Sequence, residues 1–224
     1  MRRPTDRLDR RLLIGVAAVT LLLIGACDGG EDAPTTNQPP AGTGASEDAA
    51  GAAAEEAATG FLEAFGALDV EQARIYLADD AVIASMGAQD DLRLLISYLE
   101  ATGYRQTLDP CEASGESALG TTIRCAFAFH ALRSGEIGLG PYSGGAFNLV
   151  VRDGEIVQVS QGWEIEEFSP QVWEPFAEWV STTYPEDAAV MYVDSSLSGV
   201  RLTEESIQLW GRRTREYVEE VGGQ

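Results

Sequence analysis

The hydrophobic pattern of this chain of 224 residues changes its period at Gly103. Upstream of it, apolar side chains recur every three or four positions over residues 55–66, 69–77 and 91–102, which predicts three amphipathic helices. Downstream, apolar and polar side chains alternate, which predicts β-strands. The strands are expected at residues 104–108, 121–132, 146–151 and 155–164. Helices followed by a run of strands indicate an α+β domain with an antiparallel sheet.

Local signals mark where several of these elements begin and end. Asp69, with Gln72 three positions later, forms a capping-box pattern at the start of the second helix. Asp79 and Asp80 are expected to end that helix before a short strand. Arg152-Asp153-Gly154 lies between the last two predicted strands, and Asp-Gly is a preferred two-residue turn of β-hairpins.

Two phrases of the sequence resemble the nuclear-transport-factor-2-like (NTF2-like, or SnoaL-like) superfamily. They are Phe61–Ile83, FLEAFGALDVEQARIYLADDAVI, and Phe147–Trp163, FNLVVRDGEIVQVSQGW. With the intervening pattern, the resemblance covers residues 55–168. It implies an α+β cone, in which a strongly bent antiparallel or mixed sheet wraps the N-terminal helices and leaves an apolar pocket. Proteins of many activities share this fold, so the fold alone does not indicate a function.

Six aromatic side chains are candidates for lining that pocket. They are Phe61, Phe65, Tyr76, Phe127, Phe129 and Trp163. The pocket is expected either to bind a small apolar ligand or to be filled by the chain's own side chains. No catalytic residue is assigned.

Residues 169–224 continue beyond the part that resembles the superfamily. Ser169-Pro170 and Glu174-Pro175 are signals for the start of a helix. Thr203, followed by two acidic residues, is expected to cap a final helix. One apolar stripe runs along that helix: Ile207, Trp210, Thr214, Tyr217, Val218 and Val221. A C-terminal helical extension packed on the open end of the cone, or on its sheet, is therefore expected.

Residues 1–26 have the organisation of a bacterial lipoprotein signal peptide. Residues 1–11 contain five Arg and two Asp, and residues 12–26 are almost entirely apolar or small. As a helix, this apolar run spans roughly 22 Å, less than the ~30 Å hydrocarbon core, which is typical of an export signal. Its end, Leu23-Ile24-Gly25-Ala26-Cys27, resembles the lipobox, which implies that Cys27 carries lipid such as palmitate and begins the mature chain. An uncleaved signal anchor is the alternative.

The segment after the signal peptide is predicted to be a disordered tether over residues 27–54. It contains Gly, Ala, Pro, Thr, Ser and acidic residues but no large apolar side chain. The net charge of the whole chain is −21, and loss of residues 1–26 makes it near −24. Such a charge repels phosphate backbones, so nucleic acid is not expected as a partner. It also disfavours adsorption to anionic lipid, so the lipid on Cys27 is expected to anchor an extracytoplasmic domain to the bacterial cell membrane.

Two further cysteines, Cys111 and Cys125, form an even pair in a chain expected to be exported to an oxidising compartment. They lie at the end of one predicted strand and within the next. Adjacent antiparallel strands would place them opposite each other. A disulfide between them is therefore expected, with two buried free thiols as the alternative.

Patterns for metal binding and catalysis are weak. His130 is the sole histidine, and HxH, HExxH and CxxC patterns are absent from the sequence, so neither a metal nor a cofactor is expected. Ketosteroid isomerases resemble this fold and use a tyrosine as oxyanion donor and an aspartate as general base. Phe61 stands at the position of that tyrosine and Ser85 at the position of that aspartate, which argues against their mechanism in this chain. The acidic cluster at residues 164–167 is expected to be a solvated rim.

Non-catalytic binding of a small apolar ligand, or a self-filled pocket, is the function that these patterns favour for an envelope lipoprotein. One alternative is an extracytoplasmic acid-base enzyme of the dehydratase, isomerase or hydrolase type. The other is an interaction module that binds an envelope protein or a second copy of the chain. A pocket with several buried polar groups would indicate the enzyme. A pocket filled by Trp173 or Trp179, together with an exposed apolar sheet face, would indicate the interaction module.

Overall fold

The computed structural model describes residues 44–85, 88–89 and 92–223, which belong to one compact unit. The predicted signal peptide, Cys27 and the tether as far as residue 43 lie outside the described residues. Within the described ranges, no helix is both long and apolar enough to span a bilayer.

The centre of the fold is a six-stranded mixed sheet with the order β2-β1-β6-β5-β4-β3. Its strands are β1 (Leu77–Ser85), β2 (Ala88–Gln89), β3 (Arg105–Ser117), β4 (Gly120–His130), β5 (Tyr142–Arg152) and β6 (Glu155–Gly162). β1 runs parallel to β6, and the other neighbours are antiparallel. Asp153 and Gly154 have positive φ angles of 55° and 84°, as the predicted two-residue hairpin between β5 and β6 requires.

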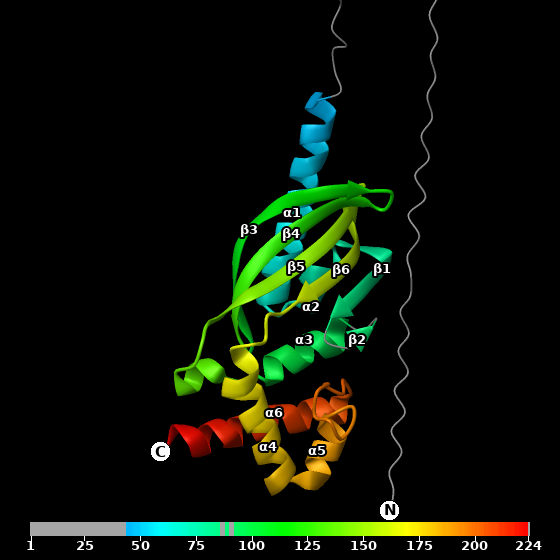
Figure 1. Ribbon diagram of the computed structural model, residues 1–224. Helices are drawn as coiled ribbons and strands as arrows, with labels where there is room; N and C mark the ends of the chain where they lie inside the picture. The colour runs from blue at the N-terminus through cyan, green and yellow to red at the C-terminus, as the bar shows by residue number, and fades with distance from the viewer. Residues whose placement is uncertain (1–43, 86–87, 90–91, 224) are drawn as a thin grey trace, which may run out of the picture. The chain divides into compact units, whose positions relative to one another are not determined.

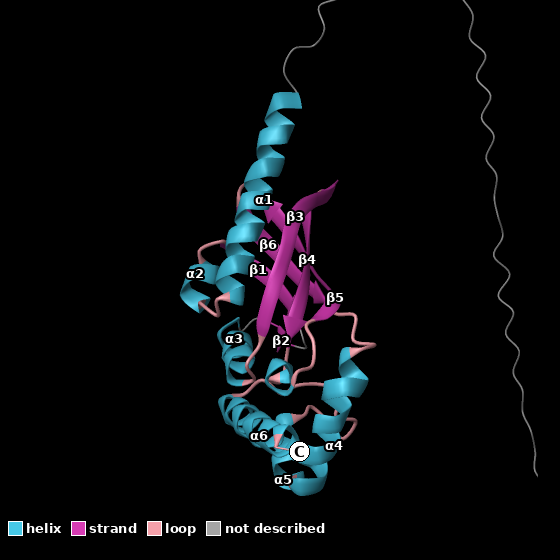
Figure 2. Cartoon of the chain, turned by 90° about the vertical axis from the view of Figure 1, so that its left-hand side faces the viewer, coloured by secondary structure: helices cyan, strands magenta, loops and turns pink. Residues whose placement is uncertain are grey.

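Three helices precede the long strands. They are α1 (Gly44–Gly66), α2 (Val70–Arg74) and α3 (Leu92–Ala101). α1 lies against the concave face of the curved sheet, which bends around it (Figures 1 and 2). The Asp69 side chain caps α2 by accepting a hydrogen bond of 3.0 Å from the Gln72 amide, as predicted. The predicted fold class, an α+β cone with a C-terminal helical extension, is confirmed.

Two expectations about local structure were wrong. α1 begins at Gly44, so the predicted tether does not reach residue 54. Alanine and glutamate favour the helix in this segment, and the small Ala54 and Ala58 are buried where the backbone approaches the sheet. Asp79 and Asp80 do not end α2 but lie exposed within β1, where its pairing with β6 is interrupted.

The C-terminal extension forms a second helical layer at one end of the cone. Its elements are a π-helical turn (Ser169–Trp173), α4 (Glu174–Thr183), α5 (Pro185–Met191) and α6 (Glu204–Gly222). α6 contacts α3, so the extension lies at the end of the sheet and not across its outer face (Figure 1). Thr203 caps α6 by accepting a hydrogen bond of 3.2 Å from the Ser206 amide, as predicted.

The expected apolar stripe of α6 is buried around Trp210, which is 0% exposed, but it does not extend to Val221, which is 39% exposed near the end of the helix. Its ring contacts four other aromatic rings with centroids 5.0–5.7 Å away: Tyr98, Trp173, Phe176 and Tyr192. Its Nε1 donates a hydrogen bond of 3.1 Å to the Met191 carbonyl. Trp210 therefore joins α3 of the cone to every segment of the extension.

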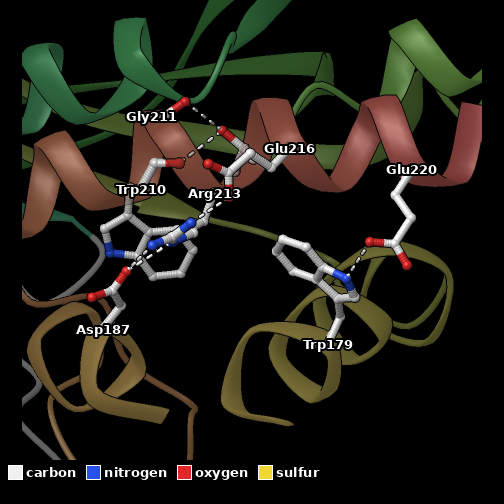
Figure 3. A network of polar contacts seen from close by, with 8 residues as sticks. Trp179, Asp187, Trp210, Gly211, Arg213, Glu216 and Glu220 are labelled. Carbon is white, nitrogen blue, oxygen red and sulfur yellow. Dashed lines mark hydrogen bonds and ion pairs between the residues drawn. The ribbon is translucent and has the colours of Figure 1, made fainter. Parts of the chain in front are cut away.

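A charged contact holds α5 against α6 on the outer side of this aromatic cluster (Figure 3). The Arg213 guanidinium donates to Asp187 from Nε at 2.7 Å and from Nη2 at 2.5 Å, and it also donates to Glu216. It lies 3.5 Å from the centroid of the Tyr184 ring. The two carboxylates accept hydrogen bonds from the N–H groups at the edge of the planar guanidinium, and the Tyr184 ring packs on its face. Lysine could not reproduce this arrangement.

Cys111 and Cys125 are directly opposite each other on β3 and β4 and form the predicted disulfide. The pairing of these strands is interrupted between Leu108 and Cys111, where Pro110 lacks an amide proton. β3 is also the edge strand of the sheet. The disulfide therefore lies at the point where pairing of the edge strand resumes.

Candidate functional site

The interior of the cone is filled by its own aromatic side chains. Four of the six residues predicted to line a pocket lie there instead, each at most 2% exposed: Phe61, Phe65, Phe127 and Phe129. Phe127 contacts Phe147 with ring centroids 4.7 Å apart, and Phe147 contacts Phe65 at 5.6 Å. The rings of these four residues pack in the interior, which agrees with the self-filled alternative for the cone and not with the lining of an open pocket.

Tyr76 also lies away from the interior. Its ring covers the outside of α1 at Gly60, where an added Cβ would come within 2.5 Å of the ring. It borders an open groove on that side of the helix. Glycine at position 60 is therefore required for the ring to approach the helix, and Tyr76 is a packing residue.

An apolar pocket of about 540 Å³ lies between the end of the cone and the extension. It is lined by Tyr98 and Leu99 of α3, by Thr102 in the turn that follows, by residues 131–132 after β4, and by side chains within residues 163–173 and 193–200. Trp163 is thus the one predicted lining residue that reaches it. The volume falls within the range of small-molecule sites, about 300–1,000 Å³.

Two elements shape the wall contributed by the extension. The segment 163–173 leaves β6 and carries Trp163, Phe168 and Trp173 into the wall. The loop 193–200 closes on itself through an antiparallel bridge between Tyr192 and Val200. The indole of Trp173 holds this loop by donating a hydrogen bond of 3.0 Å to the Leu197 carbonyl.

Few polar groups enter this pocket. Tyr98 is the sole titratable side chain among the described residues that line it. Burial, with a smaller contribution from Tyr192, raises the pKa of the Tyr98 phenol above its ordinary value, so the phenol stays protonated at physiological pH. Thr102 lies in the turn after α3, and its hydroxyl donates back to the Tyr98 carbonyl at 2.8 Å. Neither a carboxylate nor an imidazole is present among the lining residues described.

The two exposed apolar side chains at the pocket are Ile165 and Val193, which are 52% and 54% exposed. They come from different segments of the chain, one from the segment after β6 and the other from the loop after α5. Large apolar side chains held in water next to an apolar pocket mark its entrance.

The other residues considered for catalysis or metal binding are hydrogen-bonded within the fold or exposed to solvent. The His130 Nδ1 lies 3.1 Å from the Leu139 carbonyl and 3.4 Å from the Ser134 hydroxyl, so the ring is hydrogen-bonded within the loop after β4. Glu164, Glu166 and Glu167 are exposed, in agreement with a solvated rim. Across the residues that the structure describes, no cluster of His, Cys, Asp or Glu could hold a metal ion.

Comparison with known proteins gives fold similarity to solved structures. No family model matches the sequence, and no curated protein matches it. A protein of Xanthomonas campestris pv. campestris, provisionally described as a polyketide cyclase, has 19% identity and a TM-score of 0.41 over 55% of this chain and 98% of its own. A similarly described protein of Silicibacter sp. has 17% identity and a TM-score of 0.40 over 52% and 93%. An NTF2-like protein of unknown function from Cytophaga hutchinsonii has 8% identity and a TM-score of 0.36 over 50% and 91%.

Sequence reasoning missed most of the pocket because its walls come from four segments that are distant along the chain. Leu99 and Leu132 were predicted only as part of the helix at residues 91–102 and of the strand at residues 121–132, and the loop 193–200 carries no motif. The proline signals at Ser169-Pro170 and Glu174-Pro175 correctly indicated helix starts. They did not indicate that the turn between them would form a wall of the site.

Proposed function

We propose that this chain is a bacterial envelope lipoprotein that binds a small apolar molecule in the pocket between its cone and its C-terminal extension, without transforming it. In this proposal the lipid on Cys27 anchors the chain outside the cytoplasm. The support for the anchor is the order of signals in the sequence: a basic start, a short apolar run, a lipobox-like end and an acidic domain.

The observation that carries the binding proposal is the chemistry of the pocket walls. They combine aromatic and aliphatic side chains with a volume of about 540 Å³ and an apolar entrance at Ile165 and Val193. Burial of apolar ligand surface contributes roughly 25 cal/mol per Å², so such walls favour a hydrophobic molecule.

The same walls disfavour the two alternatives. An acid-base enzyme needs a group that accepts a proton near neutral pH, and the raised pKa of Tyr98 makes it unsuited to that role. An interaction module was expected to combine a pocket filled by Trp173 or Trp179 with an exposed apolar sheet face. Trp173 lies in the wall and leaves the volume open.

The binding proposal is tested with N-phenyl-1-naphthylamine, an uncharged dye that fluoresces in apolar sites. The chain from residue 28, made without Cys27 and its lipid, is the appropriate sample, because the described residues belong to one compact unit. We expect one dye per chain, at micromolar affinity, with quenching of tryptophan emission because Trp163 and Trp173 line the site. We also expect equal affinity at pH 5 and pH 9, since Tyr98 stays protonated across that range.

Ala131→Phe, which places a ring in the pocket, is expected to weaken dye binding at least tenfold. Ala128→Phe is the matched control, because Ala128 lies partly exposed on β4, three residues before Ala131, but does not line the pocket. Cooperative urea unfolding of both variants would show that they fold. Equal affinity of wild type and Ala131→Phe would contradict the assigned site, and a strong pH dependence would favour an acid-base group.

The anchoring proposal makes a separate prediction. Cys27→Ala removes the sulfur that would carry the lipid, so we expect the variant to lose labelling by an alkyne fatty acid fed to the cells and to retain residues 1–26. The control is Cys111→Ala with Cys125→Ala, which leaves Cys27 in place. A Cys27→Ala protein that is present in the membrane at normal levels, with the wild type equally unlabelled, would favour the signal-anchor alternative.

A further inference from the structure

Two serine side chains are accessible in the wall of the pocket. Ser169 belongs to the segment after β6 and is partly exposed, and Ser198 belongs to the loop after α5 and is exposed. The other two hydroxyl-bearing residues of the described wall are buried, since Tyr98 is 3% exposed and Thr102 is 1% exposed. A molecule that enters the pocket from solvent can therefore reach the hydroxyls of the two serines.

Both of these serines already donate their hydrogen within the chain. Ser169 Oγ donates to Glu174 Oε1 at 3.1 Å. Ser196 Oγ donates to Asp194 Oδ1 at 2.5 Å, because an ionised carboxylate can only accept. A hydroxyl has one hydrogen, so Ser198 is the donor in its contact of 2.7 Å with Ser196 Oγ. Ser169 and Ser198 can therefore offer a ligand only a hydrogen-bond acceptor.

Negative charge lies close to both acceptors. Glu174 and Asp194 are exposed. Hydrogen bonds from the hydroxyl and the amide two residues later hold the pKa of Asp194 below its ordinary value, so this carboxylate is ionised at physiological pH. The exposed Glu164 and Glu166 also flank the entrance residue Ile165. Carboxylates on both segments favour a cation at the entrance.

We infer that the ligand of this pocket is an apolar molecule with a protonated amine at one end, which donates hydrogen bonds to the accessible serines. This inference rests on the proposed binding function and specifies the chemical class of the ligand. The apolar walls bury the body of the molecule. The amine stays at the entrance in contact with water, which avoids the cost of burying a charge.

The surroundings offer an anionic ligand no comparable partner. None of the described lining residues is a cation. Arg201 follows the lining residue Val200, but its Nη2 donates to the carbonyls of Tyr192 and Val193 at 3.0 and 2.8 Å. The net charge of the chain, −21, adds repulsion at longer range. A carboxylate on the ligand would therefore weaken binding.

The test measures displacement of N-phenyl-1-naphthylamine at pH 7 by three molecules with the same apolar part. They are 6-phenylhexylamine, hexylbenzene and 6-phenylhexanoate, which are a cation, an uncharged hydrocarbon and an anion. We expect the wild type to bind the amine more tightly than the carboxylate. Glu174→Gln with Asp194→Asn removes both charges and keeps an acceptor for each serine. This double variant is expected to weaken the amine about fivefold and to change hexylbenzene less than about twofold.

Glu178→Gln with Asp153→Asn is the matched control. It removes two exposed charges as well, one from α4 and one from the turn between β5 and β6, and neither residue lines the pocket. We expect it to leave the affinity for the amine unchanged. Cooperative urea unfolding of both double variants would show that they fold.

Each other result has a definite meaning. If the first double variant weakens amine and hydrocarbon equally, or if the control weakens the amine as much, the two carboxylates do not select the ligand and the inference is wrong, although the pocket still binds. If the wild type binds the carboxylate more tightly than the amine, the inference is also wrong. If the dye itself does not bind the wild type while the chain unfolds cooperatively, the proposed function fails, and the inference fails with it.

Discussion

Trp210→Ala is expected to lower the free energy of unfolding by about 3–5 kcal/mol, the range for truncation of a large buried aromatic residue. The side chain is 0% exposed and fills the space between α3, α5 and the π-helical turn before α4. Alanine would leave a cavity among four aromatic rings and remove the indole donor from the Met191 carbonyl. Urea denaturation followed by circular dichroism would measure the change. Dye binding should weaken in parallel, because Trp210 supports the pocket residues Tyr98 and Trp173.

Trp179→Ala is the matched control for that variant. Trp179 is only partly buried, and its Nε1 donates to the exposed Glu220 carboxylate at 3.0 Å (Figure 3). Trp179→Ala is expected to lower the free energy of unfolding by less than half as much as Trp210→Ala does, and to leave dye affinity unchanged. If the two variants are destabilised equally, Trp210 does not hold the extension to the cone in the way that its contacts indicate.

Features set by neighbouring residues could be predicted from the sequence. Asp69 and Thr203 cap their helices because a side-chain oxygen accepts from an amide three residues later. Asp153-Gly154 makes the hairpin because both residues adopt positive φ. The Cys111–Cys125 pair could also be predicted, since consecutive strands that pair in an antiparallel fashion bring such positions together. Each of these features depends on a short stretch of chain.

Features set by packing between distant segments could not be predicted. The sequence contains apolar aromatic residues on the strands, but it does not state whether their rings fill the cone or line a space. Phe127 and Phe129 fill it because Phe147, Phe168 and Trp163 pack against them. The open pocket lies instead at the end of the cone, where residues of the C-terminal extension form part of its walls. The start of α1 was missed for a related reason, since the small size of its alanines matters only once the sheet lies against them.

Loss of the Cys111–Cys125 disulfide is expected to lower the free energy of unfolding by about 3 kcal/mol. The bond joins residues 14 apart, and the estimate is the chain entropy that a closed loop of this length removes from the unfolded state. The interruption at Pro110 adds a local reason, because β3 is an edge strand with one neighbour and depends on the bond to resume its pairing. Cys111→Ala with Cys125→Ala is the suitable variant, since alanine places no new polar group at the buried position 125.

Reduction of the wild type provides the second arm of this experiment. Cys125 is 0% exposed, so the reductant is added to the unfolded chain and unfolding is then compared with and without it. We expect reduced wild type and the double alanine variant to unfold at similar urea concentrations, both below that of the oxidised protein, and the variant to be insensitive to reductant. Peptide mapping without reduction should give a linked fragment that contains both cysteines. Two free thiols in the native protein, or a midpoint that does not change on reduction, would show that the bond does not stabilise the fold. In that case the edge strand is held by its hydrogen bonds to β4 and by α1 alone.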